Sequence, residues 1–265
     1  MGAPYSSQNS SLTAINVDSA NPNFSSDGGV LFNKTKTELI KYPSSRPGIT
    51  YVIPASVTSI RYYGFSGNLF LTSLAIPNTL TTLGGQVFLS AQALTTISIG
   101  TGLSALGDQS FADISTLTSI NVDAANTSFA SIDGVLYNKN ITTLYAYPNG
   151  KSGTTFTAPN TVTSTRYTAF GYNNPNLVTV SLPGLSSLSG QEFEDAISLQ
   201  EVTLGNALTD LKTQVFQGDA ALKIVTFGTG LTHISDGAFY GNASLYCVVY
   251  PGSNASVENM HIQME

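Results

Sequence analysis

The chain has 265 residues, only 10% of them charged, and a net charge of −6. Neutralising nucleic-acid phosphates requires clustered Lys and Arg, so we expect no bound nucleic acid. With 42% hydrophobic residues, the chain can bury a sizeable core and should fold. No apolar run approaches the roughly 20 residues of a membrane-spanning helix, so we expect no membrane insertion.

The two ends of the chain are polar. The first residues, MGAPYSSQNSS, have neither the basic start nor the apolar stretch of a signal peptide. The protein is therefore intracellular, or its leader lies outside this sequence. We assign residues 1–11 to an N-terminal tail and 260–265 to a C-terminal tail. The single cysteine, Cys247, cannot form an internal disulfide, so stability must come from packing.

An apolar frame returns every 23 residues along most of the chain. Two consecutive copies are Leu71, Leu74, Ile76, Leu80, Leu83, Phe88 and Leu94, Ile97, Ile99, Leu103, Leu106, Phe111. Two apolar residues two positions apart lie on one face of a strand. Such a short unit cannot bury its frame alone, so neighbouring copies must stack. The repeat predicts a β-rich solenoid of about ten coils with short parallel strands and little helix.

A longer duplication lies on top of the short repeat. Residues 12–65 match residues 117–170 at a constant offset of 105. In both copies a first strand leads into GVLFN or GVLYN, a polar turn, and ELIKYP or TTLYAYP. Two β-rich runs around a polar turn indicate a hairpin. We therefore expect one solenoid over residues 12–259, with hairpin inserts at about 24–43 and 129–148.

The repeat motif resembles a known family. ITYVIPASVTSIRYYGF (49–65) and LTSLAIPNTLTTLGGQVF (71–88) are similar to BspA-like leucine-rich repeats. The insert FSSDGGVLFNKTKTELIKYP and the end VVYPGSNASVEN resemble the hairpin and the C-terminal finish of that family, which places a cap at 245–259. The resemblance implies a leucine-rich repeat solenoid that is extracellular or on the cell surface and contributes to adhesion. The leader would then be absent from this chain.

The sequence departs from the family pattern at one slot, three residues after the repeat Phe. The family often has Cys there, whereas this chain has Asn68, Ala91, Ile114, Asn173, Ala196, Asp219 and Asn242. We expect this departure to affect only the packing of that turn.

Few residues could perform chemistry. Nucleophilic catalysis needs a base held by a third group, and the histidines are His233, in an outward slot, and His261, in the tail. Cys247 has no histidine in an obvious partner slot, so we expect no enzyme activity and no cofactor. Glu192, Glu194 and Asp195 form the densest acidic group, which we interpret as a solvated turn rather than a cation site, and we expect no metal. Asp18 and Asp123 recur with the duplication and predict either an Asx-type turn or a cap at the strand end.

The outward positions of the first strand in each coil are the main candidate binding residues. Small polar side chains there keep an exposed sheet soluble, but stacked coils would also align them into two columns on a contact face. The candidates are Ser73, Thr96, Ser98, Ser119, Asn121, Thr179, Ser181, Glu201, Thr203 and Thr226.

The hairpins carry a second group of candidates, because loops displayed on a rigid scaffold often bind partners. These are the aromatic residues Phe32, Tyr42, Tyr137, Tyr145 and Tyr147. We expect some of them to pack back onto the solenoid, and any that stays exposed to be a contact residue.

We conclude from the sequence that the chain is a non-enzymatic surface or secreted binding module, monomeric, for a protein or glycan. Two alternatives remain open. One is a structural spacer within a larger surface protein. The other is a carbohydrate-binding or carbohydrate-acting protein that uses the acidic group near Glu192.

Overall fold

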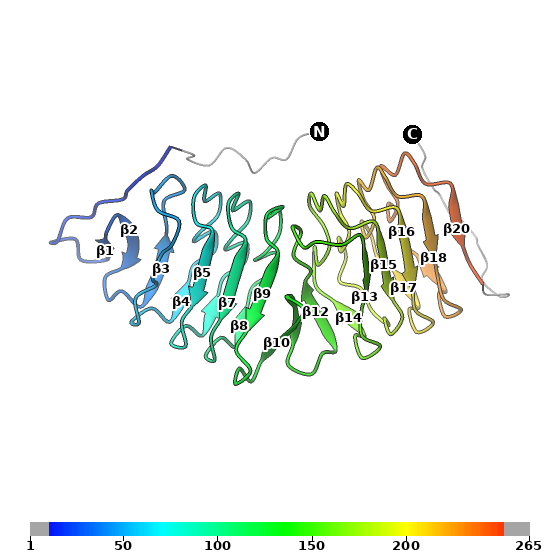
Figure 1. Ribbon diagram of the computed structural model, residues 1–265, viewed down its shortest axis with the longest axis horizontal. Helices are drawn as coiled ribbons and strands as arrows, with labels where there is room; N and C mark the ends of the chain where they lie inside the picture. The colour runs from blue at the N-terminus through cyan, green and yellow to red at the C-terminus, as the bar shows by residue number, and fades with distance from the viewer. Residues whose placement is uncertain (1–10, 252–265) are drawn as a thin grey trace. The chain divides into compact units, whose positions relative to one another are not determined.

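The computed structural model describes residues 11–251, which form a β-solenoid of about nine turns with no helix in that range (Figure 1). About ten coils were expected. The copy that begins at Leu245 is described only through its first strand, β20 (Cys247–Val249), which accounts for the difference. The expected N-terminal tail up to residue 10, the cap beyond residue 251 and the tail at 260–265 lie outside the described residues. Within 11–251 there is accordingly no helix able to cross a membrane.

The chain divides into two compact units, Met1–Leu136 (unit 1) and Tyr137–Glu265 (unit 2). The boundary falls within β11, in the second hairpin. The strands of the two duplicated blocks correspond to one another, and corresponding strands start 105 residues apart, as the duplication predicts. The corresponding pairs are β1 (Phe24–Asp27) and β10 (Phe129–Ile132), β2 (Val30–Asn33) and β11 (Val135–Asn138), β3 (Glu38–Lys41) and β12 (Thr143–Ala146), and β4 (Ser59–Ile60) and β14 (Ser164–Thr165).

Unit 1 contains two main sheets. The first strands of successive coils, β5 (Ser73–Ile76), β7 (Thr96–Ile99) and β9 (Ser119–Val122), pair in parallel. The second, two-residue strands β4, β6 (Thr82–Leu83) and β8 (Ala105–Leu106) form a separate parallel ladder. The hairpin formed by β1, β2 and β3 joins this ladder through β3, which pairs in parallel with β4. The hairpin is therefore part of a sheet rather than an excursion from it.

Unit 2 repeats this arrangement. Its main parallel sheet has the order β13 (Thr155–Thr157), β15 (Thr179–Leu182), β16 (Glu201–Leu204), β18 (Ile224–Thr226) and β20. The short strands β17 (Asp210–Leu211) and β19 (His233–Ile234) pair beside it, and β12 pairs in parallel with β14. The coils of β13, β16 and β18 again contribute one longer and one shorter strand, whereas the coil of β15 has only an isolated bridge from Ser187 to Ser164 in place of the second strand.

The repeat phenylalanines form a continuous stack inside each unit. In unit 2 the ring centroids of Phe170, Phe193, Phe216 and Phe239 are separated by 5.0, 5.1 and 5.3 Å. These separations are close to the ~4.8 Å spacing of paired strands, because each ring packs on the same ring of the next coil. The frame residues Leu74, Ile97 and Ile120 are likewise buried in unit 1. The 23-residue frame is thus the core.

Hydroxyl side chains link neighbouring coils at the surface. The Thr95 Oγ1 donates to the Thr72 carbonyl oxygen at 2.8 Å, and the Thr118 Oγ1 donates to the Thr95 carbonyl at 3.0 Å. The same type of contact occurs in unit 2 just before the short second strands, where the Thr232 Oγ1 donates to the Thr209 carbonyl at 3.0 Å. Part of the Ser and Thr content therefore stabilises the stacking rather than contacting a partner.

The turns that the duplication repeats are held by side chains. Asp18 and Asp123 each accept the backbone N–H two residues later, from Ala20 and Ala125, which confirms the expected Asx turns. In the first hairpin, the Asn33 Oδ1 accepts the backbone N–H groups of Thr37 and Glu38. Asn138 holds the second hairpin turn in the same way, through Thr142 and Thr143.

Candidate interaction surface

The outward residues of the first strands form two columns in unit 1. The strand register aligns Ser73 with Thr96 and Ser119, and Ala75 with Ser98 and Asn121. Ser98 and Asn121 are exposed, and the other three polar residues are partly exposed. The alternation read from the sequence therefore places these side chains on the outer face, and the columns are in register across three coils.

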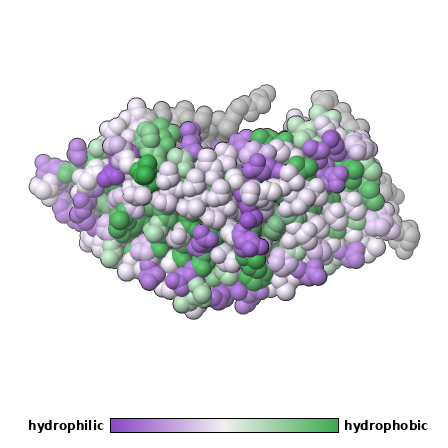
Figure 2. Space-filling model, viewed as in Figure 1, coloured by the Kyte–Doolittle hydropathy of each residue, from purple (hydrophilic) through white to green (hydrophobic). Residues whose placement is uncertain are grey.

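Unit 2 continues the pattern over more strands. One column holds Thr155, Thr179, Glu201, Ile224 and Cys247; the other holds Thr157, Ser181, Thr203, Thr226 and Val249. Every candidate in these columns is exposed or partly exposed. Most of the surface visible in Figure 2 has the pale colour of intermediate hydropathy, with small purple and green areas. The candidate positions themselves are mostly neutral and polar.

Four of the five hairpin aromatics belong to the core, so the expectation that they are candidate contact residues is wrong for these four. Phe32 and Tyr42 have no exposed surface, and Tyr137 and Tyr147 are also buried. The Tyr42 ring stacks on Phe65 with centroids 5.0 Å apart, because β3 is a member of the sheet. A buried ring cannot contact a partner in the folded protein.

Tyr145 is the remaining hairpin aromatic and is partly exposed. The Arg166 guanidinium lies over its ring, 5.5 Å from the centroid. This cation–π contact joins the second hairpin to the next coil, so Tyr145 also has an internal partner.

The acidic group near Glu192 does not form a paired-carboxylate site. Glu192 is fully buried, and its carboxylate accepts hydrogen bonds from the backbone N–H groups of Ser189 and Gly190 and from the Thr165 hydroxyl at 3.1 Å. Burial raises the pKa of Glu192 to about 7, although these donors act in the opposite direction. Glu194 accepts the Tyr172 hydroxyl at 2.8 Å, whereas Asp195 is exposed.

The expectation of a solvated turn is therefore wrong for Glu192, which is a structural group of the coil interior. A carboxylate without access to a groove cannot act on a sugar, so the carbohydrate-acting alternative loses the residue it relied on. Asp219 is buried as well and accepts the Ala196 N–H at 2.8 Å. Within residues 11–251, no group of three or more His, Cys, Asp and Glu could hold a metal ion.

His233 is exposed on β19, as its outward slot predicts. Cys247 is partly buried on β20, whose strand register places it beside Ile224. His261 lies outside the described residues.

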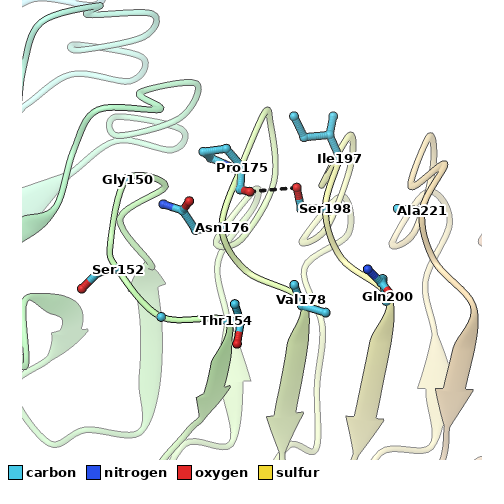
Figure 3. Close-up of a pocket in the computed structure, with 11 residues that line it drawn as sticks. Gly150, Ser152, Thr154, Pro175, Asn176, Val178, Ile197, Ser198, Gln200 and Ala221 are labelled. Atoms are coloured by element: carbon cyan, nitrogen blue, oxygen red, sulfur yellow. Dashed lines mark hydrogen bonds between the residues drawn. The ribbon is translucent and has the colours of Figure 1, made fainter.

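A groove along the strand starts of unit 2 was not identified from the sequence. It encloses about 630 Å³. Thr154, Val178 and Gln200, each directly before a strand, lie in a row along it, and the loops that hold Asn176 and Ile197 line it as well (Figure 3). We call it the unit 2 groove.

The signal for this groove was present in the duplication. Thr154 corresponds to Ile49 at the offset of 105, and Asn176 corresponds to Phe70 once the alignment gains one residue before Leu177. The first block has two large apolar residues at these positions and the second block has two smaller polar residues, so the surface differs between the two copies.

Short parallel strands, an aromatic stack and one coil per 23 residues define a leucine-rich repeat solenoid. The chain belongs to the BspA-type leucine-rich repeat family. The model of the BspA type leucine rich repeat region matches residues 44–152 and 140–263.

Two solved structures share the fold. The pneumococcal vaccine antigen PcpA aligns with a TM-score of 0.61 and 23% identity, over 86% of this chain and 70% of that one. A leucine-rich repeat protein from Eubacterium ventriosum aligns with a TM-score of 0.55 and 20% identity, over 86% of this chain and 83% of that one. The comparison with curated proteins found no match.

Proposed function

We propose that the chain is a non-enzymatic binding module that contacts a protein or glycan at a cell surface or outside the cell. The observation that carries the proposal is the register of small polar side chains across β5, β7 and β9 and across β13, β15, β16 and β18. Solenoids present extended surfaces of this kind to their partners. Membership of the family supports the same role, and the likeness to a vaccine antigen agrees with a surface location.

The face suits a partner recognised through many weak contacts. Its side chains are short, so little rotamer entropy is lost when a partner covers them. Glu201 is the only ionised side chain among the candidate positions, so long-range attraction contributes little and binding should depend weakly on salt.

The test is binding of the purified chain to arrays of extracellular-matrix proteins and glycans. Ser98→Arg and Thr203→Arg place bulky charges on the exposed face, one in each unit. Thr82→Arg is the matched control, because Thr82 is also exposed but lies on a second strand, β6. We expect at least one face variant to weaken binding tenfold or more, with no change for Thr82→Arg. No binding to either array would contradict the proposal and favour a spacer.

A further inference from the structure

The unit 2 groove has a neutral and strongly hydrogen-bonding lining. Ionisable side chains are absent from the residues that line it. Ser152 and Thr154 supply hydroxyl groups, and Asn176 and Gln200 supply amides. A ligand that fits such a lining is uncharged and rich in hydrogen-bonding groups.

The two amides are oriented by contacts within the chain. The Asn176 Nδ2 donates to the Lys151 carbonyl oxygen at 3.3 Å, which leaves its Oδ1 as an acceptor for a ligand. The Gln200 Oε1 accepts the Lys223 ammonium at 2.8 Å, which leaves its Nε2 as a donor. One amide thus offers an acceptor and the other a donor, on neighbouring coils. Hydroxyl groups both donate and accept, so a polyhydroxylated ligand can satisfy both.

The carbonyl oxygens along the row are already paired. The carbonyl oxygen of Thr154 accepts from Val178 and Thr179, and that of Val178 accepts from Gln200 and Glu201. A peptide that adds to a sheet gains its affinity from free main-chain groups, whereas these carbonyl oxygens already have two partners each. Recognition must come from side chains, and this favours a glycan over an extended peptide.

Apolar side chains lie between the polar ones. Val178 separates Thr154 from Gln200 in the row, and Ile197 is half exposed on the loop beside them. Aliphatic groups of this kind can pack on the C–H faces of sugar rings while the amides bind the hydroxyls. The row crosses successive coils at the ~4.8 Å strand spacing, so it suits a chain of sugars rather than a single ring.

Unit 1 shows what the same fold accepts at these positions. The Thr72 N–H donates to the Ile49 carbonyl at 2.9 Å, just as the Val178 N–H donates to Thr154 at 2.8 Å. Ile49 and Phe70 are 64% and 43% exposed, so unit 1 presents large apolar side chains where unit 2 presents Thr154 and Asn176. The polar lining is therefore not required by the repeat.

We propose that the unit 2 groove binds a neutral oligosaccharide through Thr154, Asn176 and Gln200. This inference rests on the binding function proposed above and assigns it a second site and a ligand class.

The test uses the full chain on an array that carries neutral gluco-, manno-, galacto- and xylo-oligosaccharides beside acidic and sulfated glycans, with a parallel peptide array. The groove variant combines Thr154→Ile with Asn176→Phe, the residues that unit 1 has at these positions. A control variant combines Thr209→Ile with Thr213→Phe, which adds the same side chains to exposed positions of the same unit that lie outside the groove and outside the candidate face. Gln200→Glu, which places a charge in the lining, is a third and independent variant.

We expect binding to a neutral oligosaccharide that falls at least tenfold in the groove variant and in Gln200→Glu, and is retained in the control variant. Binding that is unchanged in the groove variant, or that falls equally in the control variant, would overturn the groove assignment while leaving the proposed binding function intact. Binding only to acidic glycans or only to peptides would overturn the ligand class. Silence on both arrays would overturn the inference, whereas the proposed function is overturned only if the array of extracellular-matrix proteins is silent as well. Circular dichroism and the melting temperature of each variant establish that it is folded.

Discussion

Ile97 and Ser98 are neighbours on β7, yet Ile97 is completely buried and Ser98 is exposed. The Ile97 side chain lies in register with Leu74 and Ile120 of the adjacent coils. The contrast between these two residues follows from strand alternation and assigns one face to the core and the other to the surface.

A charge at each of the two positions should therefore have very different effects. We expect Ile97→Asp to lower the free energy of unfolding by several kcal/mol, because an unpaired carboxylate would be buried. Ser98→Asp should change it by about 0.5 kcal/mol or less. Urea unfolding followed by circular dichroism measures both values, and equal losses would refute the assignment of the two faces.

Gly102 should tolerate no side chain. A Cβ at this position would lie 2.0 Å from the Asn78 carbonyl oxygen of the preceding coil, and both groups are backbone that cannot rotate away. We expect Gly102→Ala to force the coils apart and to cost at least about 1 kcal/mol, the lower end of the range for overpacking. Thr101→Ala, one residue earlier, is the control. A melting temperature of Gly102→Ala equal to that of the control would show that the turn relaxes freely.

Asn21 and Asn126 occupy corresponding positions in the two duplicated blocks, but their side chains make different contacts. The Asn126 Nδ2 donates to the carbonyls of Gly100 and Leu103 in the preceding coil, and its Oδ1 accepts from Ser128 and Phe129. Asn21 keeps only the acceptor contacts, with the backbone N–H groups of Asn23 and Phe24.

Replacing each residue with alanine should therefore distinguish the contribution of the donor contacts to the preceding coil, which only Asn126 makes, from that of the acceptor contacts, which both residues make. We expect Asn126→Ala to destabilise the protein by about 2 kcal/mol more than Asn21→Ala, since it also leaves buried carbonyl groups unpaired. Chemical unfolding of the two variants tests the difference. Equal destabilisation would mean that the contacts to the preceding coil contribute nothing.

The fold was predictable because the apolar residues that determine it recur at a fixed spacing. The spacing from Leu74 to Ile97 repeats through the chain, and each copy must bury the same face against its neighbours. The surface follows no such rule. Burial of Phe32 and Tyr42 depends on β3 joining a sheet, which the hairpin sequence alone does not specify.

The groove was not predictable from periodicity either, because its lining comes from the residues that depart from the repeat. Thr154 and Asn176 are informative only in comparison with Ile49 and Phe70. Glu192 was likewise expected at the surface, because it belongs to the densest acidic group of the sequence, and its neighbours Glu194 and Asp195 are indeed partly and fully exposed. Its burial depends on the backbone N–H groups of Ser189 and Gly190, which only the folded turn brings to it.

Glu192 should make the stability of the protein depend on pH. Its pKa is about 7 in the folded protein against an ordinary value of 4.5. The folded state therefore binds the Glu192 proton more tightly than the unfolded state does. The stability that the protonated Glu192 contributes is fully present below about pH 4.5 and is lost as the pH rises through 7. At about 1.4 kcal/mol per pKa unit, the free energy of unfolding falls by about 3 kcal/mol over this range.

Glu192→Gln removes the titrating group while keeping an oxygen for Thr165, Ser189 and Gly190. We expect the melting temperature of the wild type to fall between pH 5 and 8, and that of this variant to fall much less. Asp219, whose pKa is also raised by burial, accounts for a residual slope. Glu201→Gln on the exposed face of β16 is the control and should follow the wild type. Parallel pH profiles for wild type and Glu192→Gln would show that the buried carboxylate is ionised throughout this range, compensated by its backbone donors.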